Sequence, residues 1–313
     1  MRFRQLGSSS LKVSVVGLGT WAIGGDFWGS VDDSQSIDAI RAGIDSGINL
    51  IDTAPAYGAG HSESVVGRAI AGRRDQVIVA TKCGVVRTKD AFLRNLKPDS
   101  ITREVDESLR RLGVDSIDLY QIHWPDDDTP LEDSLEALRR LQEKGKFRYL
   151  GVSNFDPSLM RQVMQSMELV SLQPPYSLLK RDIEEEILPF CRDNNIGVLS
   201  YGSLGGGILT GKYKERPTLP PGDKRDAFYP FFDEPLWSQA QIVVDCLRVI
   251  AAERNVSPGQ VAINWAVAQQ GITTALVGVK TPEQAEENAA AGSWKLTDTE
   301  LASIESAYEE AFC

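Results

Sequence analysis

The chain has 313 residues, a length that suits one large α/β barrel or two ordinary domains. Its 44 acidic and 33 basic side chains give a net charge of -11, which argues against nucleic acids as partners, because phosphate backbones require patches of lysine and arginine. The N-terminus lacks the apolar core of a signal peptide and no run of 18 apolar residues occurs, so we expect a cytoplasmic protein that does not enter a membrane.

Apolar runs alternate with helical patterns along the whole chain. Residues 2–14 predict two short strands around Gly7, a hairpin that would close the bottom of a barrel. Isoleucines recur at helical spacing over 37–48, and Gly47 stands where a C-terminal cap is expected. The same unit then repeats. Strands are expected at 13–19, up to 53, and at 77–81, 117–122, 148–152, 170–173, 197–200 and 274–277.

Eight strands that alternate with helices predict a (β/α)8 TIM barrel, with the N-terminal hairpin and extra C-terminal helices, as a single domain over 1–313. A capping residue before proline marks helix starts at Asp156, Ser257 and Thr281, and Thr129 has in addition the spacing of a capping box. A doubly wound sheet would need Gly-x-Gly-x-x-Gly at the start of a helix. The stretch from Gly17 lacks the third glycine, which disfavours that fold.

Four ionisable side chains lie at the ends of three successive predicted strands. Asp52 ends the second strand, and Tyr57 follows on its loop. Lys82 follows the third strand and His123 the fourth. Each one alone is most simply a cap or a solvated charge. Because consecutive parallel strands end at one rim of the barrel, we expect the four to converge there as an active site.

Together these groups suit protonation of a carbonyl oxygen while a hydride arrives at the carbon. A phenol ionises near pH 10 and is a poor proton donor at neutral pH unless a neighbour stabilises the phenolate. We expect Lys82 to do this and so to lower the pKa of Tyr57, while Asp52 holds Lys82 in place. His123 would donate a hydrogen bond to the substrate oxygen and orient it.

The sequence resembles the aldo-keto reductase superfamily over almost its whole length. The motifs that carry the resemblance occupy 17–21, 52–58, 81–82, 118–124, 151–155, 173–176 and 280–288. The resemblance implies a catalytic tetrad of Asp52, Tyr57, Lys82 and His123, with no tetrad position altered. It also implies an NADP(H) cofactor.

Residues near the ends of the later strands are expected to hold that cofactor. In the resembled family, side chains equivalent to Ser153, Asn154 and Gln173 bind the nicotinamide carboxamide, and an aromatic residue such as Tyr201 stacks on the ring. The glycine-rich turn from Gly202 would approach the pyrophosphate with its backbone N–H groups. The residues expected at the cofactor are Gly19, Thr20, Trp21, Asp52, Ser153, Asn154, Gln173, Tyr201, Gly202, Ser203, Leu204, Gly206, Lys212, Gly278, Lys280, Gln284, Glu287 and Asn288.

The adenosine end of the cofactor is expected where a strand ends, a cation appears and a capped helix begins. The resemblance implies that Lys280, with Gln284, Glu287 and Asn288, holds the 2′-phosphate and the adenine. The family often has arginine at the position of Lys280. Lysine supplies one positive charge but lacks the forked guanidinium with which arginine binds a phosphate at two points. We therefore expect the protein to prefer NADP, with NAD as a possible cofactor.

Aromatic residues are expected to wall the substrate pocket, namely Trp21, Trp28 and Trp124 around Tyr57 and His123. The Pro-rich segment 214–235 is too long for an ordinary connection and predicts a flexible flap over the cofactor. Three aspartates at 126–128 predict either repulsion of anionic substrates or an exposed acidic turn.

The sequence thus predicts an NADP(H)-dependent oxidoreductase that reduces an aldehyde or ketone, or oxidises the corresponding alcohol, sugar or polyol. The alternative is a cofactor-binding regulatory module that resembles channel β subunits and turns over little. The four cysteines and two histidines lack metal-ligand spacing, so no metal site is expected. The substrate, the direction of the reaction and the oligomeric state stay open.

Overall fold

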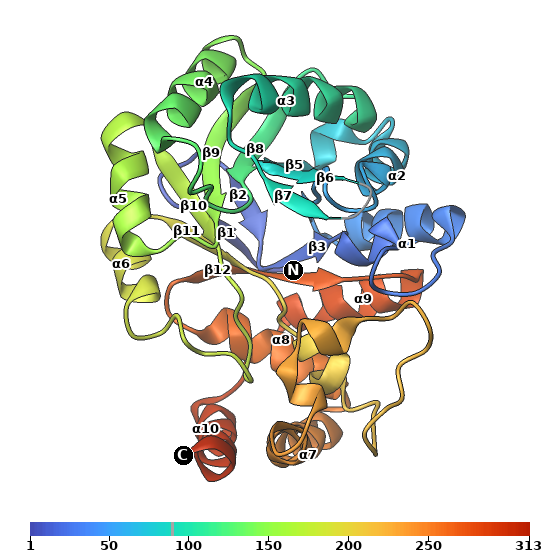
Figure 1. Cartoon of the computed structure of the whole chain (residues 1–313). Coiled ribbons are helices and arrows are strands. Elements are labelled where there is room, and N and C mark those ends of the chain that lie inside the picture. Colours follow the sequence, from blue (N-terminus) through green and yellow to red (C-terminus); the bar gives the residue numbers. More distant parts are fainter. Residues whose placement is uncertain (89–90) are drawn as a thin grey trace.

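The computed structural model describes residues 1–88 and 91–313. Eight parallel strands close into a barrel, in which each strand pairs with the next along the chain and the last pairs with the first. Helices surround this barrel (Figure 1), which confirms the predicted (β/α)8 TIM fold. The barrel strands are β3 (Val16–Gly19), β4 (Leu50–Asp52), β5 (Ile78–Cys83), β8 (Ile117–Ile122), β9 (Phe147–Ser153), β10 (Leu169–Gln173), β11 (Gly197–Ser200) and β12 (Ile272–Gly278).

The helices bury apolar faces against the outside of the barrel. Two are additional to the repeating unit: α7 lies between β11 and β12, and α10 ends the chain, so only one of the extra helices follows the last strand. Figure 1 shows these two helices below the barrel, where they contact each other. The helices are α1 (Asp33–Asp45), α2 (His61–Ile70), α3 (Pro98–Leu112), α4 (Leu131–Glu143), α5 (Pro157–Ser166), α6 (Ile187–Asp193), α7 (Leu236–Arg254), α8 (Pro258–Ala268), α9 (Pro282–Ala290) and α10 (Asp298–Phe312).

The predicted N-terminal hairpin consists of β1 (Phe3–Gln5) and β2 (Lys12–Ser14) and closes one end of the barrel. Its apolar side chains Leu6, Leu11 and Val13 form one buried cluster with side chains from six barrel strands. Val13 therefore belongs to the hairpin, and the first barrel strand begins only at Val16, three residues later than predicted. The break falls at Val15, between Val13 and Val16, so the run of valines in the sequence carries no sign of it.

The helix starts that were predicted from a capping residue before proline are confirmed in three cases. Asp156, Ser257 and Thr281 each accept a hydrogen bond from the first turn of their helix. The capping box at Thr129 is wrong. The Thr129 hydroxyl instead donates to Asp126 Oδ2 at 2.7 Å, and α4 starts at Leu131 without a side-chain cap.

A second hairpin, which the sequence did not predict, stands on the rim of the barrel beyond β5. It consists of β6 (Val85–Arg87) and β7 (Phe92–Arg94), and the Asn95 N–H donates to Gly84 O at 3.1 Å at its base. Its strands are only three residues long, too short for periodicity to indicate them. Among the residues described, no helix has the length and apolar character needed to cross a bilayer.

Candidate active site

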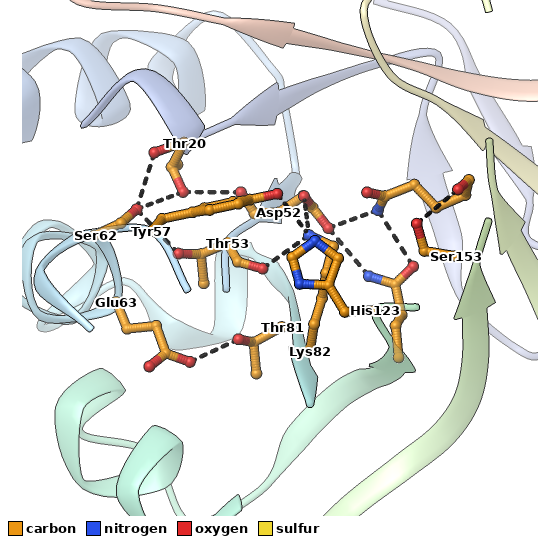
Figure 2. A network of polar contacts seen from close by, with 12 residues as sticks. Thr20, Asp52, Thr53, Tyr57, Ser62, Glu63, Thr81, Lys82, His123 and Ser153 are labelled. Carbon is orange, nitrogen blue, oxygen red and sulfur yellow. Dashed lines mark hydrogen bonds and ion pairs between the residues drawn. The ribbon is translucent and has the colours of Figure 1, made fainter. Parts of the chain in front are cut away.

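Three of the four predicted catalytic side chains meet around one buried ammonium group. Lys82 lies inside β5, one residue before its end, and its side chain is fully buried. Its Nζ donates to Asp52 Oδ2 at 2.6 Å, to Thr53 O at 3.0 Å and to Tyr57 Oη at 3.3 Å, as Figure 2 shows. The expected convergence of phenol, ammonium and carboxylate is present.

His123 completes the group. Its backbone N–H donates to Cys83 O at 2.9 Å, which fixes the end of β8 beside the end of β5. The imidazole ring lies 5.9 Å from the Tyr57 ring, nearly perpendicular to it. Burial, and then the positive charge of Lys82, hold the pKa of His123 well below its usual value. The imidazole is therefore neutral at physiological pH and can donate one hydrogen bond.

Burial decides the protonation of the phenol in a direction that the sequence argument did not anticipate. The pKa of Tyr57 is raised well above 10 by burial and by the negative charge of Asp52. The expected lowering of the Tyr57 pKa is therefore wrong, because desolvation and the charge of Asp52 both act against ionisation of the phenol. The phenol is held protonated, which is the form that a proton donor needs, and Lys82 Nζ is placed to stabilise a phenolate as it forms.

Asp52 is held by two glutamines, one of which the sequence argument missed. Gln173 Nε2 donates to Asp52 Oδ1 at 2.8 Å, and Gln121 Nε2 donates to the same oxygen at 3.1 Å. Gln121 lies on β8, two residues before His123 and two after Leu119, which packs inside the barrel. The alternation of side chains along a strand places Gln121 on that inner face, and a polar residue there was the available signal.

A layer of buried hydroxyl groups fixes β3, β4 and α2 behind the site (Figure 2). Thr20 Oγ1 donates to Asp52 O at 2.9 Å, and Ser62 Oγ donates to Thr20 Oγ1 at 2.8 Å. Glu63 is completely buried, where it accepts hydrogen bonds from Thr81 Oγ1 and Arg111 Nε, each at 2.6 Å. Thr20, a predicted cofactor residue, thus has a structural role in this arrangement.

The residues predicted to hold the carboxamide lie together, but they bond to one another. Asn154 Nδ2 donates to Ser153 Oγ at 2.9 Å, and Tyr201 Oη donates to Asn154 Oδ1 at 2.9 Å. Ser153 Oγ in turn donates to the backbone oxygen of Gln173 at 2.8 Å. Asn154 has φ of +61°, a left-handed conformation that is uncommon outside glycine and is often found at functional sites. A carboxamide would bind by exchange with these contacts.

The glycine-rich turn and the cations gather at another part of the rim. Gly206 and Gly207 have positive φ, and Gly206 O accepts a hydrogen bond from Arg225 Nη1 at 2.7 Å. Lys212 Nζ and Arg225 Nη1 lie 3.5 and 3.2 Å from where a Gly207 Cβ would be. Burial lowers the pKa of Lys280, an effect that nearby Arg225 and Lys212 reinforce and Asp223 opposes. Arg225, which the sequence argument did not select, is thus central to this cluster.

The chemistry of this cluster fits the phosphates of a dinucleotide. Lys212 and Arg225 stand beside the turn at Gly207, and Lys280 lies near both. The buried indole N–H of Trp28 has no acceptor among the described residues. Lys280 Nζ donates to Trp28 O, and the Lys280 N–H donates to Gln284 Oε1 at 2.8 Å. Glu287 is exposed on α9, whereas Asn288 is buried. Because its carbonyl oxygen binds Lys280, Trp28, which we expect at the substrate, lies at the cation cluster as well.

The segment 214–235, which carries Arg225, folds back onto the β3–α1 loop. Asp223 pairs with Trp28 in an isolated β-bridge, and the Lys224 N–H donates to Phe27 O at 3.0 Å. Arg225 forms a buried ion pair with Asp223 at 2.7 Å. Two short 3-10 turns, η4 (Arg225–Ala227) and η5 (Pro230–Phe232), give the segment regular structure within its length.

Aromatic rings gather beside Tyr57, and Trp21, which we expect at the substrate, is in the middle of them. The Trp21 ring lies 6.3 Å from the Tyr57 ring, 5.4 Å from Trp28 and 5.0 Å from Phe228. Trp124 lies further out, where it is partly exposed and covered by the Arg94 guanidinium at 4.9 Å. Of the aspartates at 126–128, Asp126 accepts hydrogen bonds from Leu96 N, Asp128 N and Thr129 Oγ1 and serves the turn.

The sequence model of the aldo/keto reductase family matches residues 15–309. The chain belongs to the aldo/keto reductase family. This oxidoreductase family acts on small carbonyl compounds, and its members share the barrel described above.

Individual aldo/keto reductases support this assignment. The NADH-specific methylglyoxal reductase of Escherichia coli is 38% identical over 94% of each chain. The structure of a glycerol dehydrogenase from Gluconobacter oxydans superimposes with a TM-score of 0.91, at 40% identity over 99% of this chain and 96% of the other. An aldo/keto reductase from Klebsiella pneumoniae, solved in complex with NADP and acetate, has a TM-score of 0.76 at 30% identity, covering 96% of this chain and 94% of its own.

Proposed function

We propose that this aldo/keto reductase is an NADP(H)-dependent oxidoreductase that interconverts a small aldehyde or ketone and its alcohol, with Tyr57 as the proton donor and acceptor. The observation that carries the proposal is the 3.3 Å contact of Tyr57 Oη with Lys82 Nζ, which is itself bound to Asp52 at 2.6 Å. Phenol, ammonium and carboxylate form a relay of hydrogen bonds beside a neutral imidazole. This is the arrangement that protonation of a developing alkoxide requires.

Each residue of the relay has a separate task. Tyr57, kept protonated by burial, gives its proton to the substrate oxygen during reduction and takes it back during oxidation. Lys82 stabilises the phenolate electrostatically, and Asp52 keeps Lys82 oriented. Neutral His123 donates a hydrogen bond to the same oxygen and sets the face of the carbonyl. The bound nicotinamide would supply or accept the hydride.

We assign the cofactor to the part of the barrel rim between the carboxamide cluster and the cation cluster. Ser153, Asn154 and Gln173 would hold the carboxamide, and Tyr201 would stack on the ring. Lys212, Lys280 and Arg225 would neutralise the phosphates. Lys280 favours NADP, although one relative is named NADH-specific, so the preference is expected to be moderate.

The names of relatives point to small polar substrates, and we propose methylglyoxal-like aldehydes and small polyols as the substrate class. The Trp21 ring, 6.3 Å from the Tyr57 ring, would line one side of this substrate. We further propose that 214–235 acts as a flap that closes over the cofactor, since Lys224 and Asp223 already bind the β3–α1 loop.

The test is NADPH oxidation near 340 nm with a panel of small aldehydes, in the wild-type protein and in Tyr57→Phe. We expect Tyr57→Phe to lose about 100-fold or more in kcat and to keep NADPH affinity. Tyr149→Phe is the matched control, because its hydroxyl bonds Ser10 in the N-terminal hairpin at the closed end of the barrel. Undiminished turnover in Tyr57→Phe would contradict the role of the phenol. Tight NADPH binding without turnover of any carbonyl would favour a regulatory module instead.

A further inference from the structure

The loop between β3 and α1 lies directly against the loop that carries Tyr57. A Cβ atom on Gly24 would lie 2.8 Å from Tyr57 C and from Gly58 N, and one on Gly58 would lie 2.4 Å from Gly24 O. Gly58 also has φ of +63°, a conformation that side chains other than glycine rarely adopt. The two backbones therefore touch without a side chain between them, and movement of one loop displaces the other.

A single carboxylate oxygen joins these two loops to a third segment. Asp26 Oδ2 accepts a hydrogen bond from the Gly58 backbone N–H at 2.9 Å. The same oxygen accepts a hydrogen bond from Arg87 Nη1, at the end of β6. The Asp26 side chain is 19% exposed and that of Arg87 is 34% exposed, so the pair lies partly sheltered on the rim.

Within the β6–β7 hairpin on the barrel rim, which we call the rim hairpin, Phe92 of β7 holds the Arg87 side chain of β6 in place. Phe92, opposite Arg87 on β7, packs against the guanidinium at 5.7 Å and against the Phe27 ring at 5.8 Å. Phe27 follows Asp26 directly. The hairpin therefore contacts the β3–α1 loop twice, once through the Arg87–Asp26 ion pair and once through the tilted rings of Phe92 and Phe27.

Few hydrogen bonds fix Tyr57. Its backbone N–H donates to Ala54 O at 3.1 Å and its carbonyl oxygen accepts from Ser62 N at 3.2 Å. Its hydroxyl accepts from Lys82 Nζ at 3.3 Å, already long for a hydrogen bond. The next residue, Gly58, is tied to the β3–α1 loop by the hydrogen bond from its N–H to the Asp26 carboxylate. A shift of well under 1 Å at Gly58 would move the phenol away from Lys82, and misplacement on this scale costs rate steeply.

We propose that Asp26, held by Arg87 of the rim hairpin, is a positioning residue that fixes Tyr57 for proton transfer. The inference rests on the role of Tyr57 proposed above. The inference gives the β6–β7 hairpin a function in the reaction, although the hairpin contributes no group that touches the substrate. Because the pair is partly exposed, the contribution of Arg87 should weaken in high salt, whereas that of the Asp26 hydrogen bond to Gly58 should not.

Steady-state kinetics of Asp26→Ala, Asp26→Asn and Arg87→Ala test the proposal. We expect kcat of Asp26→Ala to fall about tenfold while KM for the aldehyde and the affinity for NADPH change less than about twofold. Asp26→Asn should recover most of the rate, because its amide oxygen can still accept from Gly58 N–H. Arg87→Ala should fall between these two. Asp127→Ala, an exposed carboxylate on the same rim, is the matched control and should leave kcat unchanged.

Hydrogen exchange of the cofactor-free protein gives a second, independent measurement. The Gly58 amide should exchange about tenfold faster in Asp26→Ala than in the wild-type protein, and at a near wild-type rate in Asp26→Asn. Unchanged exchange, or unchanged kcat in Asp26→Ala, would overturn the inference. If Tyr57→Phe keeps its turnover, the proposed function fails instead, whatever the exchange experiment shows. Equal melting temperatures of the Asp26 variants would confirm that kcat reports on the site.

Discussion

Replacement of Lys82 by methionine should strongly destabilise the protein, because it leaves a buried carboxylate without its cation. Lys82 is fully buried and Asp52 nearly so, and their charged atoms lie 2.6 Å apart. Removal of one member of a buried ion pair typically costs about 3–5 kcal/mol, since the remaining charge keeps its desolvation penalty. The two glutamine N–H groups on Asp52 Oδ1 offset part of this, so we expect a loss of about 3 kcal/mol for Lys82→Met.

A double variant separates the charge effect from the loss of packing. In Lys82→Met with Asp52→Asn neither of these two positions carries a charge, and the asparagine oxygen can still accept from Gln121 and Gln173. We expect this pair of changes to recover about 2 kcal/mol relative to Lys82→Met alone. Urea unfolding without cofactor, followed by the fluorescence of the six tryptophans, measures both values.

The comparison needs a lysine that makes no buried contact. Lys144 caps the exposed end of α4, and Lys144→Met should change stability by less than about 0.5 kcal/mol. A loss below about 1 kcal/mol for Lys82→Met would refute the reasoning, because it would show that water reaches Asp52 easily. A double variant no more stable than Lys82→Met would refute it equally, by assigning the loss to packing.

Three further predictions follow from single residues. Burial raises the pKa of Glu104 from 4.5 to about 7, so its contribution to stability is full below pH 4.5 and is lost as the pH rises through 7. Glu104→Gln does not lose this contribution. Between about pH 4.5 and pH 8, its free energy of unfolding in urea titrations should therefore rise relative to that of the wild type by up to about 3 kcal/mol. Asp118 accepts hydrogen bonds from Arg74, Val79 N and Arg148 on neighbouring segments, so Asp118→Ala should lower the free energy of unfolding by about 2–4 kcal/mol, and a melting temperature equal to that of Asp127→Ala would contradict this. Arg225→Ala removes the bond to Gly206 O and the Asp223 pair, so it should weaken NADPH binding about tenfold and speed protease cleavage within 214–235; cleavage that NADPH does not slow in the wild type would count against the flap.

Local sequence patterns were enough to predict the barrel and the four central residues of the site. Alternating apolar runs and helix starts are determined by neighbouring residues, and parallel strands must end at one rim. Asp52, Lys82 and His123 at successive strand ends therefore had to approach one another once the barrel was assumed. The capping residues Asp156, Ser257 and Thr281 were equally local and equally predictable.

What the sequence could not determine depends on contacts between residues far apart in the chain. Gln121 supports Asp52 only because β8 and β4 face one interior, and Arg225 joins the cation cluster only because 214–235 folds back to Gly206. The direction of the Tyr57 pKa shift likewise follows from burial, which no motif reports. The Asp26 tether joins three loops whose lengths and turns carry no periodic signal. The local sequence pattern thus determined the fold and the reacting groups. Closure of the barrel and desolvation determined the protonation of these groups, the side chains that hold them and their exact neighbours.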